Sequence, residues 1–261
     1  MSNPEILILD DFSAVSDKAL EIAGNWAHRL KLHLATLHIC NTDDACEPAK
    51  ENMHLRAAKY AAPGAVKTFA RCGNLFREIR NCYIQEHPYM LVFGTHGIHG
   101  IRQVLFGAHS MKIIEETSCP ALLVQAHTPA RFPQRWMVVN NTPWDAHSVN
   151  RLSGLLKSTE ASAGLIHFSL DSDETSAEEE TALNTTEQML RDAGKQVHTE
   201  AVTRQGFGAG FSRQIYEHLG LGGYDLLVLS RQAYPILGKA AYEADCEALI
   251  NNPAGIPVLF I

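Results

Sequence analysis

The chain has 261 residues, of which 46% are hydrophobic, and this is enough to build one large domain or two of about 130 residues. Its formal net charge of −7 gives no electrostatic reason to expect nucleic acid or an anionic membrane as a partner. There is no apolar run of about eighteen residues and no basic segment ahead of an apolar one at the start, so we expect a soluble, cytoplasmic protein.

Strands and helices are predicted to alternate through the first half of the chain. An apolar run at 5–9 is followed by apolar residues at helical spacing up to Leu30, with Ser13 or Ser16 as the N-cap. Further strands are predicted at 33–39, 66–70, 89–94 and 121–125, and helices at about 48–62, 75–86 and 107–117. Strands separated by helices predict a parallel sheet with helices on both faces.

The fourth of these strands ends in glycines. Gly94, Gly97 and Gly107 have the spacing G-x2-G-x9-G, and a helix is predicted to begin near Gly107. Backbone amides approach an anion closely only where no Cβ intervenes, and the positive end of that helix dipole would favour a phosphate. A tight turn without any ligand is the alternative interpretation of the same glycines.

Three strand ends are expected to meet at one crevice. In an open parallel sheet, ligands bind beyond the carboxyl ends of the strands, where the strand order reverses. Asp11, Ile39 and the segment from Gly94 to Gly97 all lie at such ends. His38 and Cys40 alternate on the second strand and are interpreted as packing residues.

The pattern restarts after a proline-bearing linker at 128–133. Strands are predicted at 135–139, 163–168, 197–202, 224–230 and 257–261, and helices at about 174–193, 211–219 and 239–250. Thr142 followed by Pro143 is typical of an N-cap and a first helical residue. The repetition predicts an internal duplication, with one domain at 1–127 and a second at 134–261.

The second copy lacks the glycine motif. Ser230-Arg231-Gln232-Ala233 replaces the segment from Gly94 to Gly97, and Asn141 replaces Asp11. Ser230 and Gly238 are 8 positions apart, whereas Gly94 and Gly107 are 13 apart. A shortened loop without these glycines cannot enclose a triphosphate in the same way, so we expect the second half to be free of nucleotide.

The glycine motif, together with the closing run from Cys119 to Val124, resembles the last third of a universal stress protein domain. Nearly the whole chain is similar to a tandem universal stress protein. This resemblance implies two Rossmann-like α/β domains of the adenine nucleotide alpha hydrolase type. Each would have a five-stranded parallel sheet of strand order 3-2-1-4-5, with helices on both faces. It also implies that the two repeats pair through their last strands as an intramolecular pseudo-dimer, and a homodimer is considered as well.

The resemblance further implies that the first domain binds ATP or AMP, with or without Mg²⁺. Asp11 would contact the nucleoside, and the backbone of Ile39 would read adenine. The full set of implied binding residues is Leu9, Asp11, Ile39, Phe93, Gly94, Gly97, Gly107, Ala108 and His109. Ala108 departs from the family, because a Ser or Thr hydroxyl would contact phosphate there. If a triphosphate binds, Asp10 is expected to point away or to meet a divalent cation, since two carboxylates would repel the phosphates.

Two functions follow from these observations. The first is a stress-response regulator that binds nucleotide and has at most weak ATP hydrolysis, because no nucleophile elbow or Ser-His-Asp arrangement is visible. The alternative is a stress scaffold that binds no nucleotide and acts through a regulatory protein partner, as Ala108 suggests. An adenylate-forming enzyme of the related hydrolase superfamily is disfavoured, because no SGGxDS-like loop follows the first strand.

No metal site is predicted. His96 and His99 lie near the glycines, but no Cys or carboxylate accompanies them at ligand spacing. The six cysteines, at 40, 46, 72, 82, 119 and 246, include no CxxC pair, so neither a zinc knuckle nor a disulfide framework is indicated.

Overall fold

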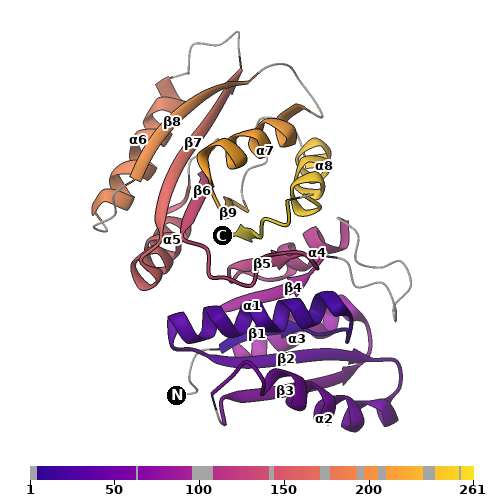
Figure 1. Ribbon diagram of the computed structural model, residues 1–261. Coiled ribbons are helices and arrows are strands. Elements are labelled where there is room, and N and C mark those ends of the chain that lie inside the picture. The colour runs from indigo at the N-terminus through magenta and orange to yellow at the C-terminus, as the bar shows by residue number, and fades with distance from the viewer. Residues whose placement is uncertain are drawn as a thin grey trace. The chain divides into compact units, whose positions relative to one another are not determined.

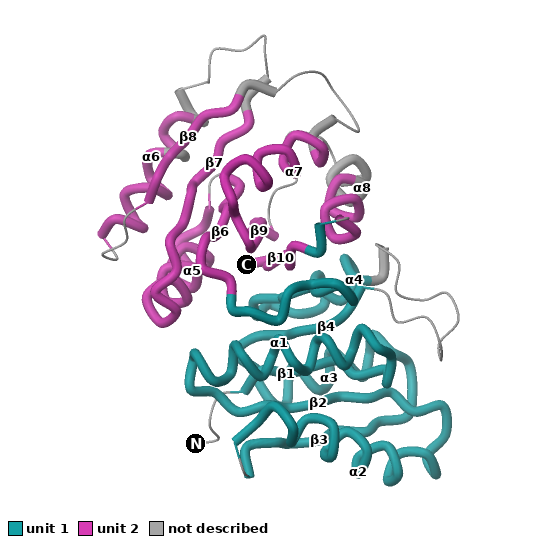
Figure 2. Tube along the Cα trace, in the orientation of Figure 1, with its two compact units in different colours: residues 1–132, 253–255 teal, residues 133–252, 256–261 magenta. Residues whose placement is uncertain are grey.

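Alternating strands and helices make up both halves of the chain in the computed structural model (Figure 1). The structure describes residues 5–62, 64–95, 108–140, 144–170, 177–192, 197–204, 210–231, 239–252 and 254–261. Two compact units can be distinguished, residues 1–132 with 253–255 and residues 133–252 with 256–261 (Figure 2).

The first unit is a parallel α/β sheet. Its elements are β1 (Glu5–Leu9), α1 (Ala14–Leu30), β2 (His33–Cys40), the short 3-10 helix η1 (Asp43–Ala45), α2 (Cys46–Ala57), β3 (Val66–Cys72), α3 (Leu75–Glu86), β4 (Met90–Gly94), α4 (Ala108–Glu116) and β5 (Ala121–Val124). Neighbouring strands pair in the order β3-β2-β1-β4-β5, and every pair is parallel. The predicted order 3-2-1-4-5 is therefore confirmed in this unit.

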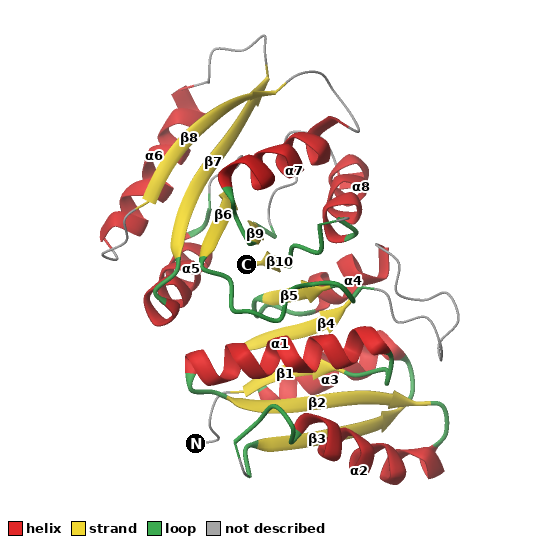
Figure 3. Ribbon diagram, in the orientation of Figure 1, coloured by secondary structure: helices red, strands yellow, loops and turns green. Residues whose placement is uncertain are grey.

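The direction of the crossovers places the helices of the first unit. The connections through α1 and α2 lead from β1 to β2 and on to β3, whereas those through α3 and α4 lead towards β4 and β5. Because such crossovers are right-handed, opposite directions put the helices on opposite faces of the sheet. Figure 3 shows α1 in front of the strands and α3 behind them.

Burial on both faces explains the unbroken apolar strands. Ile6, Leu7 and Ile8 of β1 are each 0% exposed, as expected for a parallel sheet that is covered on both sides. On α1, Trp26 is fully buried, and its ring centroid lies 4.7 Å from that of Phe132. The core of the first unit therefore runs continuously from the central strand into the linker that follows β5.

Local signals fix both ends of α1. Ser13 is the N-cap, and its hydroxyl accepts a hydrogen bond from the Ser16 amide at 3.2 Å, which satisfies one of the free amides of the first turn. The helix ends where Lys31 adopts a left-handed conformation with φ of 56°. Of the two serines that the sequence allowed as N-cap, Ser13 is confirmed.

Helix α2 is shorter than predicted. It ends at Ala57 and not near residue 62, and the chain then turns so that Tyr60 approaches α1. A Cβ built on Gly24 would lie 2.6 Å from the Tyr60 Cβ, so only glycine permits this contact. The sequence pattern alone could not reveal a contact between segments so far apart in the chain.

The second unit repeats the same topology. Its elements are β6 (Arg135–Val139), α5 (Ala146–Thr159), β7 (Ser162–Leu170), α6 (Ala177–Asp192), β8 (Val197–Arg204), α7 (Gly210–Gly222), β9 (Leu226–Leu229), α8 (Lys239–Ile250) and β10 (Val258–Phe260). The strands pair in the order β8-β7-β6-β9-β10, all parallel. Counted within this unit the order is again 3-2-1-4-5, as predicted.

The predicted N-cap of α5 is wrong. Thr142 and Pro143 lie outside the described residues, and α5 begins at Ala146 with Asp145 as its N-cap. The Asp145 carboxylate accepts hydrogen bonds from the Ser148 amide at 2.9 Å and from the Ser148 hydroxyl at 3.0 Å. Aspartate is as good an N-cap as threonine, so the sequence offered two starts and the helix uses the later one.

Candidate functional site

A pocket opens at the carboxyl ends of β1, β2 and β4 in the first unit. It encloses about 550 Å³, its opening to solvent included. Strands β1 and β4 are the neighbours between which the strand order reverses, and ligands of open α/β sheets bind at such a point. Five of the nine residues that the resemblance implied for nucleotide binding line the pocket: Leu9, Asp11, Ile39, Phe93 and Gly94.

The other predicted site residues belong to the segment that leads into α4. Gly97 and Gly107 lie outside the described residues, as do His96 and His99. Ala108 and His109 are the first two residues of α4, and their backbone alone is described. The predicted roles of these residues therefore stay predictions.

Gly94 is required by packing as well as by its place at the pocket. A Cβ built on this residue would lie 2.3 Å from Val15 Cγ1 and 3.0 Å from Val15 Cβ. Val15 is buried in the first turn of α1, so β4 can end beneath this helix only with a glycine at that position. Gly94 thus has a structural cause that does not depend on a ligand.

Asp10 borders the pocket, but its carboxylate is engaged elsewhere. Arg56 of α2 donates from Nη1 to both carboxylate oxygens, at 2.6 Å and 2.7 Å, and the Ser16 hydroxyl donates at 2.8 Å. The Asp10 side chain is 0% exposed. The Asp10 charge is thus neutralised by an arginine, and the arrangement expected for Asp10 beside a triphosphate stays a prediction.

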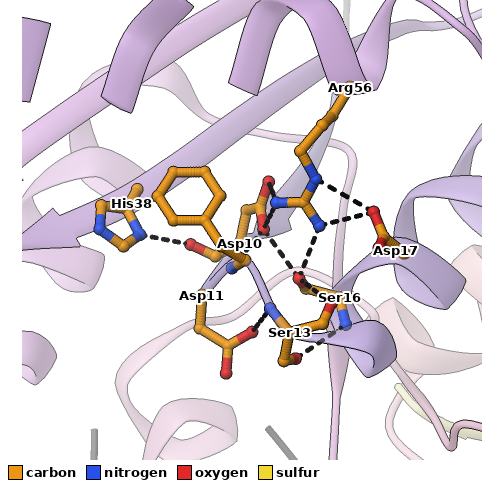
Figure 4. A network of polar contacts seen from close by, with 8 residues as sticks. Asp10, Asp11, Ser13, Ser16, Asp17, His38 and Arg56 are labelled. Atoms are coloured by element: carbon orange, nitrogen blue, oxygen red, sulfur yellow. Dashed lines mark hydrogen bonds and ion pairs between the residues drawn. The ribbon is translucent and has the colours of Figure 1, made fainter. Parts of the chain in front are cut away.

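Arg56 joins α2 to the start of α1. Its Nη2 donates to Asp17 Oδ1 at 2.7 Å and to the Ser16 hydroxyl at 3.1 Å, and Nε donates to Asp17 at 3.0 Å (Figure 4). Charge-assisted hydrogen bonds of this kind are the stronger ones in proteins. The arginine therefore holds the loop after β1 against two helices, a role that the sequence analysis did not foresee.

Phe12 has a backbone conformation that is costly for a bulky residue. Its φ is 64°, in the left-handed region, where a non-glycine residue costs on the order of 1–3 kcal/mol. Three contacts hold it there: the amide donates to Asp10 Oδ1 at 2.9 Å, the ring centroid lies 4.3 Å from that of His38, and Arg56 Cζ lies 5.2 Å from the ring centroid. This turn separates Asp10, which faces Arg56, from Asp11, which lines the pocket.

Asp11 keeps part of its carboxylate available to a ligand. Its Oδ1 accepts a hydrogen bond from the Ser13 amide at 3.0 Å. Among the residues that the structure describes, Oδ2 has no partner, and the side chain is half-buried at the pocket wall. A carboxylate oxygen in this position accepts hydrogen bonds from hydroxyl groups.

His38 contributes more than the packing that the sequence suggested. Its Nδ1 donates to the carbonyl oxygen of Asp10 at 2.7 Å, which leaves Nε2 as an acceptor in the neutral ring, and the side chain lines the pocket. In the second unit, His167 Nδ1 lies 3.1 Å from the carbonyl oxygen of Asn140. Two strands that correspond in the two units thus carry the same histidine-to-carbonyl contact.

Side chains of α3 and α4, which cover the face of the sheet opposite α1, complete the lining of the pocket. Leu75 and Ile79 of α3 and Ile113 of α4 supply apolar walls. The sequence analysis missed these residues because they lie inside helices, where an apolar residue signals core packing first. The available signal was that α3 precedes β4 and α4 follows it, so both helices are connected to the strand whose carboxyl end borders the pocket.

The second unit differs at the corresponding strand ends. Asn140 takes the place of Asp10 and is buried, and Ser230 follows β9 where Gly94 ends β4. Asn141, Gln232 and Ala233 lie outside the described residues. The expectation that this half is free of nucleotide stays a prediction.

Two further searches cover the described part of the chain alone. Within it, no group of three or more His, Cys, Asp or Glu residues is arranged to hold a metal ion. Within it, too, no helix has the length and apolar character needed to cross a membrane.

Comparison with known proteins relates the chain to one family. Among solved structures, a universal stress protein from Archaeoglobus fulgidus DSM 4304 is 16% identical, and the match covers 100% of this chain and 98% of that chain with a TM-score of 0.70. A candidate universal stress protein from Pseudomonas aeruginosa UCBPP-PA14 is 13% identical, with 100% and 93% covered and a TM-score of 0.60. At such identities the likeness shows the fold alone.

A family model matches the first part of the sequence. No curated protein matches the chain significantly. Residues 3–125, which span most of the first unit and its pocket, match the model of the universal stress protein family. Over these residues the chain is therefore similar to the universal stress protein family, and the fold of its first unit agrees with that match.

Proposed function

We propose that the first unit binds an adenine nucleotide, ATP or AMP, and that the chain acts as a stress-response regulator. The observation that carries this proposal is the pocket at the carboxyl ends of β1, β2 and β4. Residues chosen from the sequence on three separate strands border it together, and the family match covers all three strands. A surface turn without a ligand would not require this convergence.

The walls of the pocket suit a nucleoside. Phe93, Ile79 and Ile113 would enclose the apolar faces of the base, and the backbone at Ile39 would hydrogen-bond its edge. Asp11 would accept hydrogen bonds from the ribose hydroxyls through its available oxygen. The phosphates would extend from Gly94 towards the first turn of α4, where the helix dipole favours negative charge.

Nucleotide release is the first experiment. Protein purified without added nucleotide is denatured, and the released small molecules are identified by mass spectrometry. We expect ATP, ADP or AMP at about one equivalent per chain, as a single site in the first unit requires. Finding none, followed by no heat of binding when ATP or AMP is titrated, would contradict the proposal.

A matched pair of variants ties binding to the pocket. Asp11→Asn removes the negative charge from the pocket wall and is expected to weaken nucleotide binding by about tenfold, the value of one hydrogen bond to a charged group. Asp44→Asn makes the same chemical change at an exposed position of η1 and should leave the affinity unchanged. Calorimetry measures both, and equal affinities for the two variants would remove Asp11 from the site.

The second candidate function is a scaffold that acts through a protein partner. Two observations favour it: Ala108 offers no hydroxyl to phosphate, and the Asp10 carboxylate is paired with Arg56, so it is not placed to hold Mg²⁺. A scaffold would show no saturable binding of ATP or AMP at millimolar concentration. Saturable binding in the micromolar range would reject it.

The family resemblance also supports a proposal on assembly. The two repeats would pair as an intramolecular pseudo-dimer, and two chains would associate further as a homodimer. Light scattering gives the mass in solution and separates one chain from two. A mass of one chain at all concentrations would contradict the homodimer.

A further inference from the structure

A second hollow of the first unit lies at the other end of its sheet. It encloses about 1470 Å³, its opening to solvent included, and is larger than the pocket described above. One wall is the second half of α1, the other is the segment 59–65 after α2, and the chain that enters β2 at 31–34 lies between them. Because the strands are parallel, this hollow lies at their amino ends. We call it the amino-end groove.

Contacts within the fold hold the sides of the amino-end groove in place. A Cβ built on Gly24 of α1 would lie 2.8 Å from the Tyr60 carbonyl oxygen, so the segment after α2 passes directly against the helix. The Leu34 amide donates to the Ala65 carbonyl oxygen at 2.9 Å, which joins the same segment to β2. The groove is therefore formed by the packing of the first unit and needs no ligand to shape it.

Apolar side chains make up much of the lining. They are small or half-buried, and they come from all three segments: Ala27, Leu32, Leu34, Ala61, Ala62 and Ala65. The Tyr60 side chain also borders the groove and is 38% exposed. Small-molecule sites combine such apolar walls with a few polar groups that orient the ligand.

Two lysines of the first unit differ from the others, and both line the groove. Four of the six lysines in this unit contact an acid or an aromatic ring: Lys18 with Glu21, Lys50 with Glu47, Lys67 with Glu5, and Lys112 with Phe76. Lys31 and Lys59 have no such partner among the residues that the structure describes, and both are exposed. Cations without a counter-ion are therefore concentrated at this groove, in a chain whose net charge is −7.

The negative charges near the groove are weaker than these cations. Among its lining residues Glu21 is the single acid, and it pairs with Lys18 at 2.5 Å. Helix α1 also ends here, and the carboxyl end of a helix carries about half a negative charge. The two lysines carry about two positive charges, so the groove attracts anions.

We propose that the amino-end groove binds an organic anion in which a carboxylate is joined to an apolar body, as in a fatty acid. The carboxylate would meet the ammonium groups of Lys31 and Lys59, and the apolar body would lie against the alanines and Leu32. An exposed lysine alone holds an anion weakly, so the burial of apolar surface must supply most of the affinity. A strongly acidic peptide has little apolar surface to bury there and suits the groove less well.

This site is separate from the nucleotide pocket. The pocket lies at the carboxyl ends of β1, β2 and β4, whereas the groove lies at the amino ends of the strands. The proposal therefore goes beyond the proposed function and can be tested whether or not nucleotide binds.

Calorimetric titration of the full-length chain with octanoate is the test. We expect saturable binding of one octanoate per chain, with the same affinity in the presence and absence of AMP. 1-Octanol, which lacks the charge, should bind at least about tenfold more weakly, and inorganic phosphate, which lacks the apolar body, should show no saturable binding. No binding of octanoate, competition by AMP, or equal binding of octanol or phosphate would overturn the proposal.

Lysine variants test the charged part of the groove. Lys31→Asn and Lys59→Gln should each weaken octanoate binding by about fivefold, the value of one exposed ion pair. Asparagine is chosen at position 31 because this residue has φ of 56°, which asparagine tolerates. Lys50→Gln removes a lysine that is paired with Glu47 outside the groove and should leave the affinity unchanged. An equal loss in all three variants, or no loss in the first two, would refute the assignment.

A pair of tryptophan variants tests the apolar part. Ala62→Trp fills the groove while both lysines remain, and it should weaken octanoate binding by at least about tenfold. Ala58→Trp places the same side chain at an exposed position outside the groove and should bind as the wild-type chain does. Circular dichroism checks that each variant is folded. A folded Ala62→Trp chain with wild-type affinity for octanoate would show that the ligand binds elsewhere.

Discussion

At the residue scale, the pairing of Asp10 with Arg56 determines which carboxylate of the loop after β1 is available to a ligand. Two adjacent acids follow this strand, and one is neutralised within the fold while the other keeps an oxygen available at the pocket. Taking both charges out of water is costly, so a pair of this kind is maintained by its geometry and by the further hydrogen bond from Ser16. The pair positions Asp11 without touching a ligand.

Removal of the arginine tests this interpretation. Arg56→Met leaves the buried Asp10 carboxylate without its counter-ion and is expected to lower the free energy of unfolding by about 3–5 kcal/mol. Arg80→Met removes an arginine that is 61% exposed and lies 3.6 Å from Glu116, and it should cost less than about 1 kcal/mol. Chemical denaturation measures both. Similar losses for the two variants would show that the Asp10 pair is no stronger than a surface contact.

At the element scale, helix starts show where local sequence is ambiguous. In α1 and in α5, the side chain of the N-cap residue accepts a hydrogen bond from the amide of a serine three positions later. The cap is Ser13 in one unit and Asp145 in the other, so the same geometry is reached with different side chains. Because serine does not ionise and aspartate does, only the cap residue of the second start titrates.

Helix α5 is therefore expected to weaken in acid. The backbone hydrogen bond from Ser148 lowers the pKa of Asp145 below its usual 3.8, so the charged cap stabilises the fold above that pH, and this contribution is lost as the pH falls through the lowered value. Asp145→Ala should cost about 1 kcal/mol at neutral pH and less in acid. Asp145→Ser keeps a cap that does not titrate, and its stability relative to alanine should not depend on pH. Denaturation at neutral and acid pH checks both variants.

At the scale of the whole molecule, two units of the same topology carry different strand ends. Both have strand order 3-2-1-4-5 and a histidine that donates to the carbonyl after the first strand. The first unit adds the charged loop and Gly94, whereas the second has Asn140 and Ser230 in the corresponding places. The strand order is thus the same in the two units, and the differences lie at the carboxyl ends of the strands.

Hydrogen exchange can compare the two units in one chain. With ATP or AMP at about 100 times its Kd, a single site stabilises the bound state by about 2.7 kcal/mol. We expect slower exchange in peptides that cover the loop after β1, the end of β2 and the end of β4, and no change in peptides from β6, β7 and β9. Equal protection of the second unit would show that it also binds nucleotide.

The sequence by itself determined the order and type of most elements. Apolar runs in the strands and helical spacing between them predicted two parallel sheets, and the rule that ligands bind at the carboxyl ends of strands brought Asp11, Ile39 and Gly94 to one pocket. These predictions succeeded because the periodicity of side chains is a local property of the chain.

The tertiary structure alone decided which residues became partners. Arg56 and Asp10 are 46 positions apart, and Val15, which requires glycine at position 94, lies on a different element. The same holds for the pairing of Cys40 with Cys72 and for the conformation of Phe12, whose amide donates to the Asp10 carboxylate and whose ring lies beside that of His38. Local patterns state which residues are apolar, charged or conformationally restricted, but a contact forms only when packing brings distant segments together.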